Sequence, residues 1–199
     1  MNFPKHIHHR MNEQVLWTLV EYAIQQSVAQ ERQVAILIEQ LSKWRTEHIL
    51  KFELLFWKLM EKANTHELLA ATHILHPTTN EFTFLHFRSW LLLQGQAIFK
   101  KVLNNPEYLA DLPQINIEQG SYLCPTLSET PHKAYFLKTG QLPHLKLITS
   151  ATTTQVDVAM NKQTLIDTLP HLCQKLGWGN DIPQGNWQSD DLPNVEQFS

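Results

Sequence analysis

Residues 80–112 read NEFTFLHFRSWLLLQGQAIFKKVLNNPEYLADL, and this stretch decides the fold. Its apolar side chains recur at steps of three and four residues, and those that share one face are Phe84, Phe87, Leu91, Ile98 and Val102. The period predicts one helix over 81–103, which at about 1.5 Å per residue would be on the order of 35 Å long. We therefore expect this helix at the centre of the domain, with the other elements packed around it.

Gly95 lies inside the predicted central helix, where glycine costs about 1 kcal/mol relative to alanine. It predicts either a kink or the close approach of another element. Pro106 cannot continue the helix, so residues 106–112 are predicted to form one short helical turn.

Amphipathic segments on both sides of this stretch predict further helices at about 13–27, 30–41, 46–63, 65–75 and 131–139, and a last one that begins after Asn161. Pro170 should bend or divide the last helix. Predicted N-caps are Asn12, Asn80, Thr130 and Asn161. Residues 145–148 and 155–160 are candidates for a small β-hairpin. The sequence thus predicts a mainly α protein, a helical bundle around one long central helix.

The length of 199 residues fits one domain. We expect a flexible arm over 1–11, a single α-rich domain over 12–178 and a loose, acidic tail over 179–199.

Charge and hydropathy exclude several classes of protein. The net charge is -3, without the basic patch of a nucleic-acid-binding protein or a Lys/Arg cluster for an anionic membrane surface. We see no signal peptide and no apolar run of transmembrane length. Two cysteines in a chain of this length favour free thiols in a reducing compartment. These features predict a cytoplasmic protein, although secretion without a cleavable signal stays open.

Several groups of residues match a known pattern when they are taken together. They are Leu16-Trp17, Phe52, the fourth-helix segment THELLAA at 65–71, Phe84 with Phe87-Arg88, Trp90-Leu91 and Gly95, Pro106 with Leu109-Ala110, and Ala134-Tyr135 with Thr139-Gly140. Through them the chain resembles the bacterial domain-of-unknown-function family 4240 over about 13–178. The loop HPTTNE at 76–81 departs from the family, which tends to carry Gly-Cys and paired Asp there. The resemblance implies an α-rich single domain and no established activity.

Arg88 is the most informative candidate residue, because it lies on the apolar side of the predicted central helix. A buried guanidinium needs a carboxylate or carbonyl partner. The carboxylates that could pair with it are Glu53, Glu67 and Asp111. We hypothesise that Arg88 and Glu67 line the main cleft of the domain. The alternative is a structural ion pair that joins helices, or a side chain that reaches water.

Other candidate sites have ordinary structural alternatives. His66, His73 and His76 share one side of the fourth predicted helix and would need a further ligand, Glu67 or His86, to hold zinc. Tryptophans at 17, 44, 57 and 90 would stack on a planar ligand or fill the core. Cys124 and Cys173 are nucleophile candidates or inert buried thiols. The candidate ligand- or partner-binding residues are Arg88, Glu67, His66, Glu81 and Trp90; no catalytic residue, metal or cofactor is assigned.

No strong catalytic motif is present, and this absence favours a binding role over catalysis. Our first hypothesis is a non-enzymatic module that binds another protein, such as a bacterial immunity or regulatory protein that masks its partner. The alternative is a small-molecule binder or enzyme with an Arg/Glu-lined cleft. A third hypothesis is an oligomeric scaffold.

Overall fold

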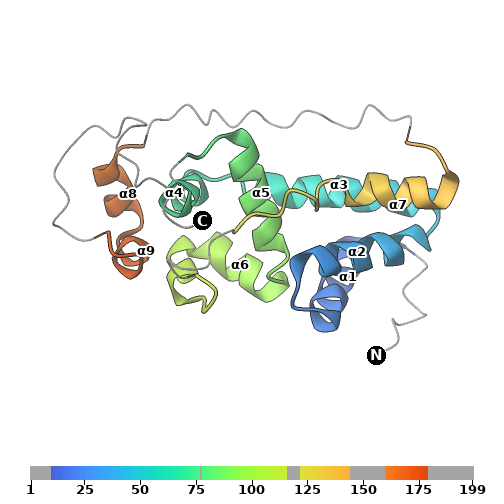
Figure 1. Ribbon diagram of the computed structural model, residues 1–199, viewed down its shortest axis with the longest axis horizontal. Coiled ribbons are helices and arrows are strands. Elements are labelled where there is room, and N and C mark those ends of the chain that lie inside the picture. Colours follow the sequence, from blue (N-terminus) through green and yellow to red (C-terminus); the bar gives the residue numbers. More distant parts are fainter. Residues whose placement is uncertain (1–9, 77, 116–121, 144–159, 179–199) are drawn as a thin grey trace, which may run out of the picture.

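The structure is a computed structural model that describes residues 10–76, 78–115, 122–143 and 160–178 (Figure 1). These ranges contain helices and their connections and no strand, which confirms the mainly α fold. In chain order the elements are α1 (Glu13–Gln26), α2 (Gln30–Ser42), α3 (Thr46–Lys62), α4 (His66–Leu75), α5 (Glu81–Leu92), α6 (Gln96–Asn104), the 3₁₀ helix η2 (Pro106–Asp111), α7 (Thr130–Thr139), α8 (Lys162–Thr168) and α9 (Pro170–Lys175).

Asparagine caps begin three of the helices as the sequence predicts. The Oδ1 atoms of Asn12, Asn80 and Asn161 accept hydrogen bonds from the backbone N–H three residues later, at 2.9–3.0 Å. The prediction for Thr130 is wrong. It is the first residue of α7, its side chain is buried, and Glu129 occupies the cap position.

The single central helix predicted over 81–103 is wrong, because the chain forms two helices there, α5 and α6. Gly95 separates them with φ 89° and ψ 164°, a conformation that is essentially restricted to glycine. After the break, the backbone N–H of Gln96 donates to Oε1 of Glu21 in α1, at 3.4 Å. The apolar period continues through the break, so it could not distinguish one long helix from two helices that both pack on the core.

The helices group at two ends of the molecule, with α5 between them (Figure 1). At one end α7 packs against α2 and α3. At the other, α8 and α9 pack against α4 and η2. Pro170 divides α8 from α9, as predicted. The segment before α7 is tied to α2 and α5, since Gln30 Nε2 donates to the Leu123 carbonyl and the Cys124 N–H donates to the His86 carbonyl, each at 2.9 Å.

The core is built from large side chains that several helices contribute. The largest fully buried ones are Trp17, Phe52, Phe56, Phe84, Phe87 and Phe99. Met11 is also buried, and its N–H lies 3.4 Å from His48 Nδ1, so the arm predicted over 1–11 is wrong at this residue. The rest of the arm up to residue 9, the tail at 179–199 and the hairpin predicted over 145–160, apart from Met160, lie outside the described residues.

Candidate functional site

Arg88 joins α5 to the end of α3. Its Nη1 donates to the Met60 carbonyl at 2.9 Å, its Nε donates to the Phe84 carbonyl at 3.4 Å, and its guanidinium carbon lies 4.2 Å from the centre of the Phe84 ring. Met60 belongs to the last turn of α3, where carbonyls lack partners within the helix. Burial lowers the pKa of Arg88 to about 10, and the nearby charge of Glu61 raises it in part. The guanidinium therefore remains charged at neutral pH.

The candidate residues do not form one site. Glu67, His66 and Glu81 are exposed, whereas Arg88 is buried on two carbonyl partners. Trp90 is also buried, stacked 5.7 Å from the Phe87 ring and edge-on to Tyr122 at 5.4 Å. None of the contacts of Arg88 given above reaches Glu67. Arg88 joins α5 to α3 through a carbonyl, and not through one of the carboxylates considered above.

Two of the three histidines considered for zinc turn inward. The Nε2 atoms of His73 and His76 are buried without a hydrogen-bond partner among the described residues, and burial lowers the pKa of both side chains. His66 is exposed on the same helix. Across the described ranges, no three His, Cys, Asp or Glu side chains are placed to hold a metal ion.

Both thiols are free and buried. Burial raises the pKa of Cys124, and burial with the nearby Glu107 charge raises the pKa of Cys173 to about 11. The thiolate is the nucleophilic form of cysteine, so both environments disfavour nucleophilic chemistry.

A small cavity of about 100 Å³ lies among α1, α3 and α6. Trp17 and Phe99 form its apolar wall, with ring centres 5.2 Å apart, and Lys62 pairs with Glu13 at its edge at 3.1 Å. Binding sites for small molecules usually measure about 300–1,000 Å³, so this cavity is too small for most metabolites.

The contact between α3 and α7 contains a buried carboxylate beneath a half-exposed imidazole. Glu53 is 1% exposed, and its Oε1 lies 3.1 Å from His132 Nε2. The contact is not aligned as a hydrogen bond, so Nε2 has no hydrogen-bond partner among the described residues, and neither has Glu53 Oε2. Burial raises the pKa of Glu53 to about 7, while a hydrogen bond from the Trp57 side chain acts in the opposite direction. Glu53 can therefore take up or release a proton near neutral pH.

Sequence reasoning missed this pair. Glu53 was considered only as a partner for Arg88. One signal was present, because Glu53 lies three residues before Phe56 and four after Ile49, on the apolar face of α3. A carboxylate at such a position is buried and must be paired or neutralised.

The second half of α7 exposes large apolar side chains. Phe136 is 50% exposed, Leu137 is 65% exposed, and Leu142, just past the Gly140 cap, is 66% exposed. The buried side of the helix is its first half, with Thr130, Pro131 and Ala134. We call Phe136, Leu137 and Leu142 the α7 apolar surface.

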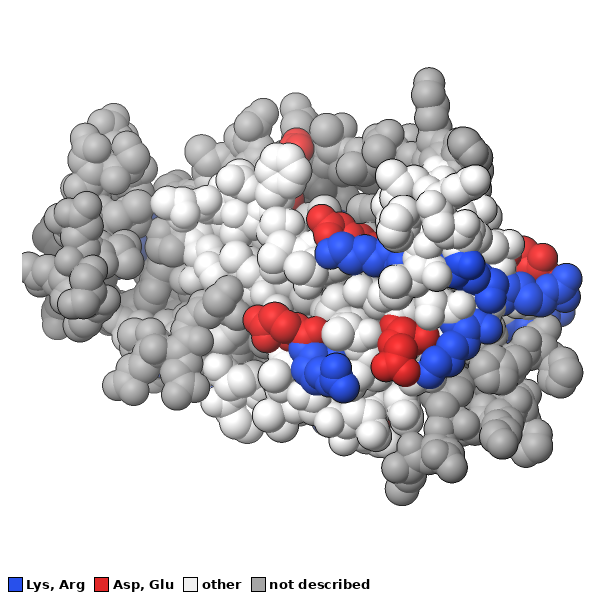
Figure 2. Space-filling model, turned by 45° about the vertical axis from the view of Figure 1, so that its right-hand side comes forward, with Lys and Arg blue, Asp and Glu red and all other residues white. Residues whose placement is uncertain are grey.

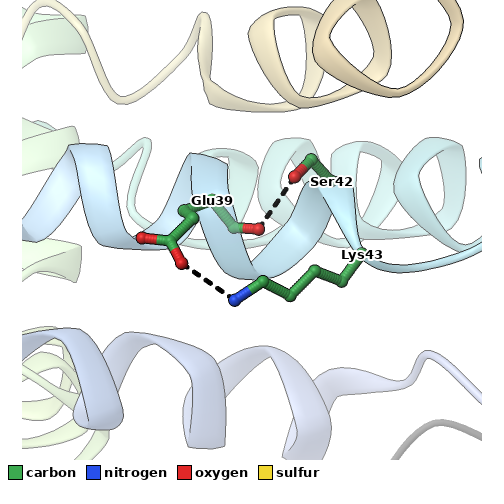
Figure 3. Close-up of polar contacts among 3 residues, drawn as sticks. All are labelled: Glu39, Ser42 and Lys43. Carbon is green, nitrogen blue, oxygen red and sulfur yellow. Dashed lines mark hydrogen bonds and ion pairs between the residues drawn. The ribbon is translucent and has the colours of Figure 1, made fainter.

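Basic side chains lie near this surface. On the face shown in Figure 2, Lys and Arg side chains gather towards the right, with Asp and Glu side chains among them. Lys138 of α7 donates to the Ser42 carbonyl at the end of α2, 3.4 Å away. Next to Ser42, Lys43 pairs with Glu39 at 2.9 Å (Figure 3). Lys133 pairs with Glu129 at 2.7 Å, and Arg45 pairs with Glu47 at 3.1 Å. All of these pairs are exposed.

Comparison with known proteins identifies the family. The model of the family described as "Protein of unknown function (DUF4240)" matches residues 11–136. The chain belongs to the DUF4240 family. This confirms the resemblance drawn from the sequence. Comparisons with curated proteins and with solved structures gave no match for this DUF4240 protein.

The family match covers Arg88 and the Glu53–His132 contact of this DUF4240 protein, and it ends at Phe136, within the α7 apolar surface. Helices α8 and α9 lie beyond it. Within the described ranges, no helix combines the length and apolar character needed to cross a membrane.

Proposed function

We propose that this protein is a non-enzymatic module that binds another protein, and that the partner docks on the α7 apolar surface. The observation that carries the proposal is the exposure of Phe136, Leu137 and Leu142 within seven consecutive positions. Single exposed apolar residues are ordinary, but a cluster of large ones favours burial against a partner.

Charge indicates the chemistry of the partner. Lys138 follows Leu137 directly and is bonded to a carbonyl and not to a carboxylate, so its positive charge remains available. Lys133, Lys43 and Arg45 are exposed nearby, and each is offset by the glutamate that it pairs with, so Lys138 supplies the excess positive charge among these groups. An apolar partner surface bordered by acidic residues would complement this end of the molecule. A regulatory or immunity protein that masks its partner would use such a contact.

Partner capture by the full chain tests the proposal. Three chains would be used as bait in the cells that express the protein. They are wild type, the double variant Phe136→Ser/Leu137→Ser and the control Phe82→Ser. Phe82 is 70% exposed on α5, so its replacement removes a similar apolar side chain elsewhere. We expect one stoichiometric partner with wild type and control, and capture reduced at least about tenfold, or roughly 1.4 kcal/mol, with the double variant.

Equal capture by all three chains would refute docking at α7. Another copy of this chain could also occupy the α7 apolar surface. Light scattering on the purified protein distinguishes this self-association from binding of a different partner. A wild-type dimer that the double variant converts to a monomer would assign the surface to self-association and would overturn the proposal of a different partner.

A further inference from the structure

We propose that Glu53 and His132 form a pH-sensitive latch that holds α7 against α3, closed at acidic pH and loosened at alkaline pH. The inference concerns regulation and rests on the proposed function only in that α7 carries the docking surface. Its geometric basis is the 3.1 Å approach of His132 Nε2 to Glu53 Oε1 across the contact between the two helices.

The carboxyl group has little other support in its buried position. Glu53 Oε2 has no hydrogen-bond partner among the described residues, and the Trp57 side chain is the group whose hydrogen bond favours the ionised form. A neutral carboxyl tolerates such a site, whereas an ionised one requires a counter-charge or water. The imidazole supplies a positive charge only while it is protonated. Rising pH therefore ionises Glu53 in a buried site that disfavours its charged form.

Other charged groups on the packed helices are engaged elsewhere. On α3 the positions three and four residues from Glu53 carry no titratable side chain; they are Ile49, Leu50, Phe56 and Trp57. On α7 and its cap, Glu129 pairs with Lys133, Lys138 donates to the Ser42 carbonyl, and Tyr135 is half-buried. On α2, which also packs on α7, Glu39 pairs with Lys43, and Glu31 and Arg32 are exposed. Among the described residues of these three helices, His132 is the titratable side chain within ion-pair distance of Glu53.

Loosening would affect α7 in particular. The second half of the helix is exposed, so its attachment depends on the first half, where Thr130, Pro131 and Ala134 are buried. Thr130 is itself fully buried, and its Oγ1 has no hydrogen-bond partner among the described residues. A helix held by so few buried side chains is expected to respond to a charge that appears beneath it.

Hydrogen exchange on the full wild-type chain, without any partner, tests the latch. After correction for the intrinsic pH dependence of exchange, protection of the α7 amides should fall at least about tenfold between pH 6 and pH 8. Protection of α9, at the far end, should stay the same. Glu53→Gln, which mimics the neutral carboxyl, should keep α7 protected at both pH values, while the control Glu47→Gln on the same helix should respond like wild type.

Equal α7 protection at pH 6 and pH 8 in wild type would overturn the latch, and so would a full pH response in a folded Glu53→Gln chain. The comparison of wild type at pH 6 and pH 8 uses no variant. The test therefore remains decisive even if Glu53→Gln folds poorly. The experiment needs no partner, so its failure is distinct from a failure of docking at α7.

Discussion

At the scale of single residues, the ionisable side chains of Arg88 and Glu53 are both buried, and they differ in how their charge is accommodated. Arg88 keeps its charge and donates to the carbonyls of Met60 and Phe84. Glu53 has its pKa raised to about 7 by burial, and it takes up a proton more readily than a solvated glutamate does. Stability should therefore depend on pH through Glu53, and on hydrogen bonds through Arg88.

The pH dependence has a definite sign. The pKa of Glu53 is about 7 in the folded chain against the usual 4.5, so the folded state binds more protons between these values. The stabilisation is complete below pH 4.5 and is lost as pH rises through 7. Glu53→Gln should therefore raise the free energy of unfolding at pH 8 by up to about 3 kcal/mol relative to wild type. Urea unfolding at pH 5 and pH 8 measures this, and a constant difference between the chains would contradict it.

Removing the Arg88 guanidinium should destabilise the fold. Arg88→Met retains most of the apolar stem but leaves the Met60 carbonyl without its partner, which costs about 1–3 kcal/mol. The exposed Arg32→Met on α2 is the matched control and should change stability by less than about 0.5 kcal/mol. Thermal unfolding of both variants tests the difference, and equal melting temperatures would count against a structural role for Arg88.

The sequence placed Arg88 correctly on the apolar side of its helix and raised a carbonyl as one of its partners. It did not identify which carbonyl, because Met60 is 28 positions away and its backbone atoms carry no sequence signal. The Glu53–His132 contact was missed for a related reason. The two residues come from helices whose packing is set by the whole fold, and spacing along the chain does not reveal which helices meet.

At the scale of elements, helix ends were more predictable than helix continuity. Asn12, Asn80 and Asn161 each supply a side-chain cap, which is a local signal. The break between α5 and α6 depends on Gly95 and on the contact of Gln96 with Glu21 from a distant helix. Only the glycine was visible in the sequence, and it left a kink and a close approach as alternatives.

Two glycines with positive φ should respond differently to alanine. Gly95 has φ 89° and ψ 164°, which only glycine tolerates well, whereas Gly140 has φ 73° and ψ 4°, in the left-handed helical region. An added Cβ would meet Ile24 at an ordinary 3.5 Å at Gly95 and nothing within 4 Å at Gly140. Gly95→Ala should thus cost about 2–3 kcal/mol and Gly140→Ala about 1 kcal/mol, both from backbone strain. Equal denaturation midpoints would refute this ranking.

Glu107 of η2 should be needed for the ordering of α9. Its two carboxylate oxygens accept from the N–H groups of His171 and Leu172, at 2.9 and 2.8 Å. Glu107→Ala removes both acceptors and should lower stability by about 1–2 kcal/mol, as loss of a helix cap does. Hydrogen exchange should show faster exchange in α9, while the exposed Asp111→Ala on the same element should leave α9 unchanged. The opposite pattern would contradict capping by Glu107.

At the scale of the whole molecule, two groups of helices lie on either side of α5 (Figure 1). Glu53 acts where α7 meets α3, and Glu107 acts where α9 meets η2. Mutations at sites that share no partners usually add within about 0.5 kcal/mol. The double variant Glu53→Gln/Glu107→Ala should therefore change the unfolding free energy at pH 8 by the sum of the single changes. A larger deviation in urea titrations would show that the two ends are coupled.

The apolar periodicity of the chain predicted a mainly α fold, and the pattern of α7 did not predict its exposed surface. Phe136, Leu137 and Leu142 are as apolar as the residues of the core, and sequence alone does not say which of them find a neighbour. That outcome depends on how far α2 and α3 extend beneath α7, which is a property of the assembled molecule.

The contact between α1 and α6 has a consequence for synthesis on the ribosome. Trp17 is buried against Phe99, and its indole N–H donates to Gln96 Oε1 at 3.1 Å when the Gln96 amide faces this donor. Glu21 and Gln96 are 75 positions apart. At roughly 5–20 residues per second, the nascent chain exposes this tryptophan for several seconds before its cover emerges. Helix α1 thus leaves the ribosome well before α6 and completes its packing late, and until then it offers a binding point for a chaperone.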